Sequence, residues 1–342
     1  MERGKLTARE IGSEFWDVPI SDSKNSVLNN NRIVWYLSGR SALSAIIRDI
    51  SSSRKVSRVL MPSWCCESMI APFIEVCAEV EFYSVLIADG KIVIDYPQHF
   101  DADVVVVMDY FGYSFDNQIP NVDFVVIRDV THSVFSRQYF DADYYFGSLR
   151  KWAGFYTGGF AIKQSGQIAQ PCLNNAKYVL LRKHAMAMKK TYIDGKRADK
   201  EYLKVFSEAE QILDSDSEIY CADDTDITRA RYLDVEFIKR KRRENAAVLL
   251  SRLDKLALFS PKANDCPLFV PIAVANRDEL NATLVSESVY CPCHWNISEL
   301  HRLSADEKLI YDCELSVVCD QRYNADDMNR ICDIIERTAK AC

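Results

Sequence analysis

One lysine and one aspartate stand in an order that suits covalent cofactor chemistry. Asp129 follows the apolar run 122–128, Lys151 comes one strand and one turn later, and Gly158-Gly159 precede the next apolar run. An aspartate at a strand end faces the crevice where open α/β sheets bind their ligands. A lysine amine forms a Schiff base with an aldehyde, and a carboxylate keeps a pyridine nitrogen protonated. The pair therefore indicates pyridoxal phosphate (PLP) chemistry, with the Schiff base on Lys151 and Asp129 at the pyridine nitrogen.

The elements that must position this pair alternate between strands and helices. Near-continuous β-branched runs at 103–109 and 122–128 predict strands that are buried on both faces, which is typical of a mostly parallel sheet covered by helices. The apolar spacing of residues 42–50 predicts a helix. From this alternation we expect an α/β protein with a large domain over residues 1–235 and a small C-terminal α/β domain over residues 236–342.

Composition and charge exclude several classes of function. The net charge of the 342 residues is −7, which leaves no basic excess for general nucleic-acid binding. No apolar run approaches the roughly 20 residues of a membrane span, and the N-terminal residues lack the hydrophobic core of a secretion signal. We therefore expect a cytoplasmic protein that binds neither nucleic acid nor membrane.

The cysteines predict neither disulfides nor a metal site. The chain has 12 of them, many in apolar runs, so reduced and buried thiols are the expected state. The segments Cys65-Cys66 and Cys291-Pro-Cys293-His294 lack the paired spacing of a zinc site. We therefore expect no bound metal.

Further segments, in a consistent order and spacing, extend the argument beyond Asp129 and Lys151. The sequence resembles the DegT-type aminotransferase family, in which an E-D-A-A-(Q/H) segment and a strand precede a lysine followed by G-E-G-G. Arg128-Asp129-Val130-Thr131-His132 corresponds to the first element, and Gly158-Gly159 follow Lys151 at the interval of the second. The other similar segments are Ser38-Gly39-Arg40-Ser41-Ala42-Leu43, Met61-Pro62-Ser63-Trp64, Tyr110-Phe111-Gly112 and Arg242-Arg243-Glu244-Asn245.

The resemblance implies a fold, an activity and an assembly. The fold is that of aspartate aminotransferase (PLP fold type I). The activity is transfer of an amino group from a donor such as glutamate to a keto acceptor, and the family acts largely on nucleotide-linked keto sugars. The resemblance also implies a homodimer with the site at the subunit boundary, which closed two-fold symmetry makes common.

The same resemblance assigns a phosphate site to the loop that opens the helix after Ser38. Gly39 and Ser41 offer backbone N–H groups at a helix N-terminus, which favours a phosphate. Arg40 either adds a charge-assisted bond to that phosphate or pairs with a nearby carboxylate. Ser148 is a further donor to the phosphate. Trp64 is expected either to stack on the pyridine ring or to pack in the core.

Three more residues receive expected roles at the reacting end of the site. Lys151 carries the cofactor and later moves protons, and burial together with Arg150 is expected to lower its pKa. His132 lies near the ring or the pyridine oxygen, unless it is a structural, hydrogen-bonded histidine. His294 either touches substrate or has a structural role.

Two departures from the family pattern keep other functions open. The family's G-Y-N-x-R loop, which reaches the partner's cofactor phosphate, has no counterpart in residues 220–232, and Thr157 replaces the glutamate of G-E-G-G. A PLP-dependent dehydratase or lyase fits the same residues as an aminotransferase. A non-catalytic binding module on the same fold is the third alternative, because a fold does not fix a function.

Overall fold

An eight-stranded sheet forms the centre of the protein. The computed structural model describes residues 9–114, 123–136 and 141–342. The order of the strands across the sheet is β2-β9-β8-β7-β6-β3-β4-β5. Their bounds are Val34–Tyr36 (β2), Arg58–Pro62 (β3), Glu79–Ala88 (β4), Lys91–Asp95 (β5), Val104–Met108 (β6), Val125–Asp129 (β7), Tyr144–Ser148 (β8) and Gly159–Lys163 (β9).

The sheet is mostly parallel, as predicted. Strands β4, β3, β6, β7 and β8 pair in parallel in that order, whereas β9 runs antiparallel to both of its neighbours and β5 runs antiparallel to β4. All five residues of β6 are buried, as its β-branched run predicts. The register pairs Met108 with Asp129 and Asp129 with Phe146, so the carboxyl ends of three strands meet at one edge.

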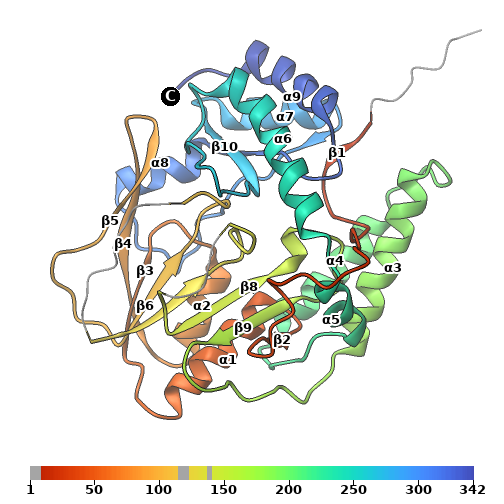
Figure 1. Ribbon diagram of the computed structural model, residues 1–342. Coiled ribbons are helices and arrows are strands. Elements are labelled where there is room, and N and C mark those ends of the chain that lie inside the picture. Colours follow the sequence, from red (N-terminus) through yellow and green to blue (C-terminus); the bar gives the residue numbers. More distant parts are fainter. Residues whose placement is uncertain (1–8, 115–122, 137–140) are drawn as a thin grey trace, which may run out of the picture.

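Two apolar layers cover the two faces of the sheet. Successive strand residues point to opposite faces, so Phe146 packs in the layer below α1 and α2, whereas Tyr145 packs against the N-terminal segment and α5. The helices, labelled in Figure 1, are α1 (Gly39–Ser51), α2 (Glu67–Glu75), α3 (Ala176–Ile193), α4 (Tyr202–Ser215), α5 (Asp224–Arg231), α6 (Val235–Leu253), α7 (Arg277–Ser286), α8 (Ala305–Cys313) and α9 (Ala325–Thr338).

The C-terminal part forms its own apolar cluster around a short sheet. Strand β10 (Phe269–Ala273) pairs antiparallel with β12 (Glu314–Val318), and α6, α7 and α9 pack on it (Figure 1). The N-terminal segment joins this part, because β1 (Ile11–Gly12) pairs in parallel with β11 (Val289–Tyr290). Among the helices of the described residues, none is both long and apolar enough to cross a membrane.

Candidate active site

A cavity of about 370 Å³ opens at the carboxyl ends of β6, β7 and β8. One end of the cavity is lined by Asp129, Thr131, His132, Lys151 and Trp295, and the other end by Ser38, Gly39, Arg40, Ser148 and Arg150. Open α/β sheets bind their ligands at this edge. The structure thus brings six of the nine residues expected at the site to one cavity, whereas Trp64, Ser41 and His294 do not line it.

The amine of Lys151 lies on the ring of His132. Its Nζ is 2.9 Å from Nε2 of His132, and the backbone N–H of Phe111 donates to Nδ1 of the same ring over 3.4 Å. Because a backbone N–H can only donate, Nδ1 is the bare nitrogen and Nε2 carries the proton. The Nε2–H group then donates to Nζ, which requires an uncharged amine. The contact therefore favours the uncharged form of Lys151.

The direction of the pKa shifts agrees with this hydrogen bond. Burial lowers the pKa of Lys151, and the charge of Arg150 lowers it further, while Cys66 and Asp129 act against the shift. Burial and then the charge of Lys151 lower the pKa of His132 well below its ordinary value. Both shifts favour the uncharged forms of the two groups.

Asp129 is a buried carboxyl that faces the cavity. Its side chain accepts a hydrogen bond from the backbone N–H of Thr131 at 2.7 Å. Burial raises the pKa of Asp129 to about 6, although the bonds from Thr131 and the charge of Lys151 act in the opposite direction. A cationic N–H group brought into the cavity would remove that cost. The residue is suited to a pyridinium nitrogen.

The start of α1 lies at the far end of the cavity. Ser38 caps the helix, since its hydroxyl accepts from the backbone N–H of Ser41 at 3.1 Å. A Cβ on Gly159 would lie 2.0 Å from the carbonyl oxygen of Ser38. Only glycine at position 159 lets β9 pass this close to Ser38, which explains why the second glycine of Gly158-Gly159 is needed. Gly158 has a φ of +117°, a conformation that favours glycine.

Arg40, at the start of α1, pairs with a nearby carboxylate, which was the alternative to binding the phosphate. Arg40 donates to the carbonyl oxygen of Leu213 at 2.6 Å and to the carboxylate of Asp214 at 3.0 Å. Its guanidinium is therefore held by the C-terminal end of α4. Ser41 is buried and its hydroxyl lies 3.1 Å from that of Ser38, so it serves the helix cap.

Arg150 brings a buried positive charge to the same end of the cavity. It forms an ion pair with Glu210 of α4, which also accepts from Arg182 at 3.1 Å. Within the described part of the chain, Nε of Arg150 is buried without a hydrogen-bond partner. A buried, unpartnered donor at the wall of a cavity suits an anion, such as the phosphate of PLP. Sequence analysis did not assign this role to Arg150, although its place beside Lys151 was a signal.

The expected stacking of Trp64 on the cofactor ring does not fit the geometry. Trp64 is fully buried, stacks on Tyr110 with ring centroids 4.9 Å apart, and donates through Nε1 to the carbonyl oxygen of His294 at 2.6 Å. The cavity is lined instead by Cys66, two residues further on, and by Trp295 from the C-terminal part. The chain after β3 turns Cys66 toward the cavity. No local sequence pattern predicted this orientation.

His294 borders a second cavity, of about 440 Å³, which also reaches Lys151. Its ring lies 5.7 Å from that of His132, and its Nδ1 is 2.9 Å from the hydroxyl of Ser316. Lys151 lines both cavities. The two cavities therefore meet at Lys151 and its neighbour Arg150.

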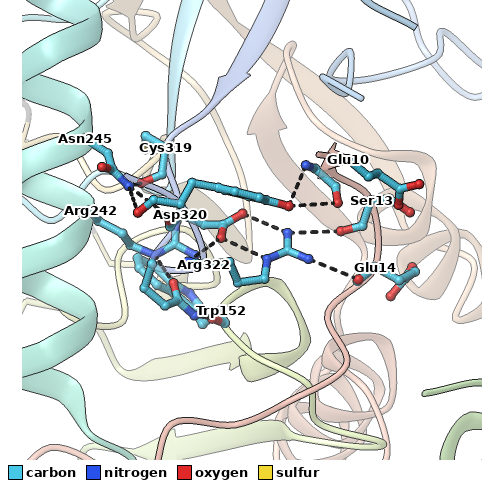
Figure 2. A network of polar contacts seen from close by, with 12 residues as sticks. Glu10, Ser13, Glu14, Trp152, Arg242, Asn245, Cys319, Asp320 and Arg322 are labelled. Carbon is cyan, nitrogen blue, oxygen red and sulfur yellow. Dashed lines mark hydrogen bonds and ion pairs between the residues drawn. The ribbon is translucent and has the colours of Figure 1, made fainter. Parts of the chain in front are cut away.

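The N-terminal segment forms one wall of the second cavity, and Arg322 holds it there. As Figure 2 shows, Arg322 lies between the segment that includes Ser13 and Glu14 and the carboxylate of Asp320. It donates to the carbonyl oxygens of Ser13 and Glu14, each at 3.1 Å, and to both oxygens of Asp320. Arg242 lies beside this network with its guanidinium 4.7 Å from the ring of Trp152. Among the described residues, no group of three or more His, Cys, Asp or Glu side chains is placed to hold a metal ion.

Comparison with known proteins gives a clear result for structure and none for sequence. By sequence, the chain matches no protein-family model and no curated protein. By structure, it is similar to PseC of Helicobacter pylori, an aminotransferase involved in the biosynthesis of pseudoaminic acid, with a TM-score of 0.59, 13% identity and coverage of 95% of this chain and 99% of the other. It is also similar to the sugar aminotransferase CalS13 of Micromonospora echinospora (TM-score 0.60, 14% identity, coverage 94% and 98%). A DegT DnrJ EryC1 StrS aminotransferase of Brucella abortus gives a TM-score of 0.57, with 15% identity and coverage of 89% and 85%.

These similarities establish the class of the fold. The chain has the aspartate-aminotransferase fold of type I PLP enzymes, with a mostly parallel central sheet covered by helices. Within that class, it has the fold of the DegT-type aminotransferases, as the sequence motifs predicted.

Proposed function

We propose that the chain is a PLP-dependent aminotransferase, which moves an amino group from a donor such as glutamate to a keto acceptor. The observation that carries the proposal is the amine of Lys151, which lies 2.9 Å from Nε2 of His132 and lines the same cavity as the buried carboxyl of Asp129. The resemblance to the DegT-type family favours a nucleotide-linked keto sugar as the acceptor, and proteins of the same fold include a sugar aminotransferase.

The residues of the first cavity fit PLP as a set. Lys151 would hold the aldehyde carbon, Asp129 the pyridine nitrogen and His132 the ring oxygen. The start of α1, with Ser148 and Arg150, would hold the phosphate. When bound, PLP supplies an electron sink for the carbon of the substrate that exchanges its proton.

The residues of this chain then provide the proton chemistry. An uncharged Lys151 takes a proton at Nζ from the substrate carbon and returns it to another carbon nearby, which is general acid–base catalysis. His132 steadies Nζ through its Nε2–H group. The second cavity, which also reaches Lys151, offers room for the keto acceptor.

The remaining expectations from the sequence belong to the same proposal. We propose a cytoplasmic homodimer with the site at the subunit boundary, and a division into a large PLP-binding domain over 1–235 and a small domain over 236–342. The family resemblance supports the dimer, and the separate apolar cluster of the C-terminal part supports the division.

Visible spectroscopy of the purified protein with added PLP tests the proposed function. We expect an absorbance band that forms with the wild type and with Lys177→Ala, an exposed lysine of α3, but not with Lys151→Ala. Glutamate should bleach the band, and a keto sugar nucleotide should restore it. If the wild-type protein forms no band, the proposal of a PLP enzyme is wrong, and the non-catalytic binding module is the remaining hypothesis. A band that no amino donor changes would indicate a different PLP reaction, such as that of a dehydratase.

A further inference from the structure

Three buried polar groups stand in a row behind the second cavity. Nδ1 of His294 lies 2.9 Å from the hydroxyl of Ser316, and that hydroxyl is hydrogen-bonded to Oε1 of Glu314. The second carboxyl oxygen, Oε2, accepts from the backbone N–H of His294 at 2.7 Å. Ser316 and Glu314 are fully buried, whereas His294 reaches the cavity. Because Nδ1 faces Ser316, Nε2 is the ring nitrogen available to a molecule in the cavity.

The hydroxyl of Ser316 has one proton and two neighbours that compete for it. If Glu314 is ionised, Ser316 must donate to the carboxylate and accept from Nδ1–H, so Nε2 of His294 is bare. If Glu314 is protonated, it donates to Ser316, which then donates to Nδ1, so Nε2 carries the proton. The charge of Glu314 therefore decides which tautomer of His294 faces the cavity.

Burial decides between these two arrangements. It raises the pKa of Glu314 to about 8, although the hydrogen bonds from Ser316 and from the backbone of His294, and the charge of Arg277, act against the shift. At neutral pH the carboxyl is mostly protonated, and the resting arrangement presents Nε2–H to the cavity. Burial likewise raises the pKa of three nearby thiols, and a charge on Glu314 would raise it further; these thiols are Cys291, Cys293 and Cys313.

We propose that Glu314, acting through Ser316, fixes the tautomer of His294 so that its Nε2–H group binds an oxygen of the substrate. Glu314 and Ser316 are positioning residues, and His294 is the residue in contact. The group that they recognise is an oxygen acceptor, such as a carbonyl or hydroxyl oxygen. Naming it as an oxygen of the keto acceptor rests on the proposed function, but the coupling of Glu314 to His294 does not.

The Glu314→Gln variant gives a sharp test of the coupling. The backbone N–H of His294 needs an acceptor, so it orients the new amide with its oxygen in the place of Oε2. The amide NH₂ then faces Ser316 and can only donate, which is the arrangement of the protonated acid. Glu314→Gln should therefore lock His294 in the form that carries the proton on Nε2, whatever the pH. Ser316→Ala should break the link between the two residues.

The measurement is ¹⁵N NMR of the histidine side chains in the full chain, with and without PLP. The protein has five histidines, so His294→Gln suffices to assign the signal. In the wild type we expect the proton on Nε2 at pH 6.5 and a shift toward Nδ1 as the pH passes about 8. Glu314→Gln should abolish this shift, and Ser316→Ala should make the tautomer independent of Glu314. A wild-type ring with its proton on Nδ1 at pH 6.5, or a pH-driven shift that persists in Glu314→Gln, would overturn the proposal.

A second readout separates the proposal from the proposed function. Ser316→Ala should lower kcat/KM for the keto acceptor by about tenfold, the loss expected for one hydrogen bond of ordinary strength, while binding of PLP stays unchanged. If the protein forms no band with PLP, the aminotransferase proposal fails, yet the NMR result still decides whether Glu314 sets the tautomer. If the NMR coupling is present and kcat/KM does not change, His294 does not contact the acceptor and the proposed recognition is wrong.

Discussion

Thr157 donates two hydrogen bonds to one carboxylate oxygen of Asp226, from its backbone N–H at 2.7 Å and from its hydroxyl at 2.9 Å. Both residues belong to segments in which the sequence departs from the DegT-type pattern. Thr157 replaces the glutamate of G-E-G-G, and Asp226 lies in the segment 220–232 that replaces the G-Y-N-x-R loop. The two departures therefore contact each other within one subunit.

Removing Asp226 should destabilise the protein. Asp226→Ala leaves the buried backbone N–H of Thr157 without an acceptor, and we expect a loss of about 1–3 kcal/mol in the free energy of unfolding. Asp226→Asn keeps an acceptor and removes a carboxyl whose pKa is raised by burial, so it should cost less. Urea denaturation checks this, with Asp224→Ala, an exposed residue of the same helix, as the control. Equal stability of Asp226→Ala and Asp224→Ala would contradict the role of the contact.

The pKa of Asp129 predicts a pH dependence of the stability of the cofactor-free protein. In the folded state this pKa is about 6, above the ordinary value of 3.8, so the folded state holds the proton more tightly than the unfolded state does. The contribution favours folding below pH 3.8 and is lost as the pH rises through about 6. Asp129→Asn lacks this titration. Relative to the wild type, the variant should gain up to about 3 kcal/mol between pH 4 and pH 7.

Urea denaturation of both proteins at the two pH values measures that difference. PLP should reverse it at pH 7, because the pyridinium stabilises the ionised carboxylate of the wild type and finds no charge in Asp129→Asn. A constant difference between the two proteins across this pH range would show that Asp129 does not titrate as the buried site requires.

Two arginines at the phosphate end of the cavity should differ in their effect on PLP binding. Arg150→Gln removes a buried charge at the cavity wall and should raise the Kd for PLP by about ten- to a hundredfold, as expected for a charge-assisted hydrogen bond. Arg40→Gln should change the Kd less than threefold, since its guanidinium is bound to Leu213 and Asp214. A PLP titration followed by fluorescence measures both. Equal effects would mean that Arg40 leaves Asp214 for the phosphate.

The thiol of Cys66 should report directly on the occupied cavity. Cys66 lines the cavity, whereas Cys77 is exposed elsewhere on the surface. We expect PLP to slow alkylation of Cys66 by a maleimide at least tenfold, because a bound ligand blocks access to the sulfur, and to leave the alkylation of Cys77 unchanged. Peptide mass spectrometry after timed quenching gives both rates. Unchanged alkylation of Cys66 at saturating PLP would place the cofactor elsewhere.

The fold and the Asp129–Lys151 part of the site could be predicted from the sequence because each depends on a short, local pattern of residues. The β-branched runs that became β6 and β7 predicted the parallel sheet, and strand ends in such a sheet share one edge. Asp129 and Lys151 each lie at such an edge, so their meeting in one cavity followed from the order of the elements. The glycines after Lys151 were a true signal for the close approach of β9 to Ser38.

The parts that could not be predicted depend on contacts between distant segments. The turn of the chain after β3 decides which side chain of Trp64-Cys65-Cys66 enters the cavity. From residue type alone, we expected Trp64 to lie against the cofactor, but Cys66 lines the cavity. Arg150 meets Glu210, and His294 meets Glu314, only because separate helices and strands pack together. Sequence patterns of period 2 or 3.6 carry no information on such pairs.

The contact of Arg322 with Ser13 and Glu14 has a consequence for biosynthesis. The wall of the second cavity depends on contacts of Ser13 and Glu14 with Arg322, which lies 309 and 308 positions later in the sequence. During translation, the ribosome synthesises Ser13 and Glu14 long before Arg322. A nascent chain stalled before residue 322 therefore has the strands and Lys151 but not the enclosed space around them. The wall beside the lysine can therefore close only after the segment that contains Arg322 has been synthesised.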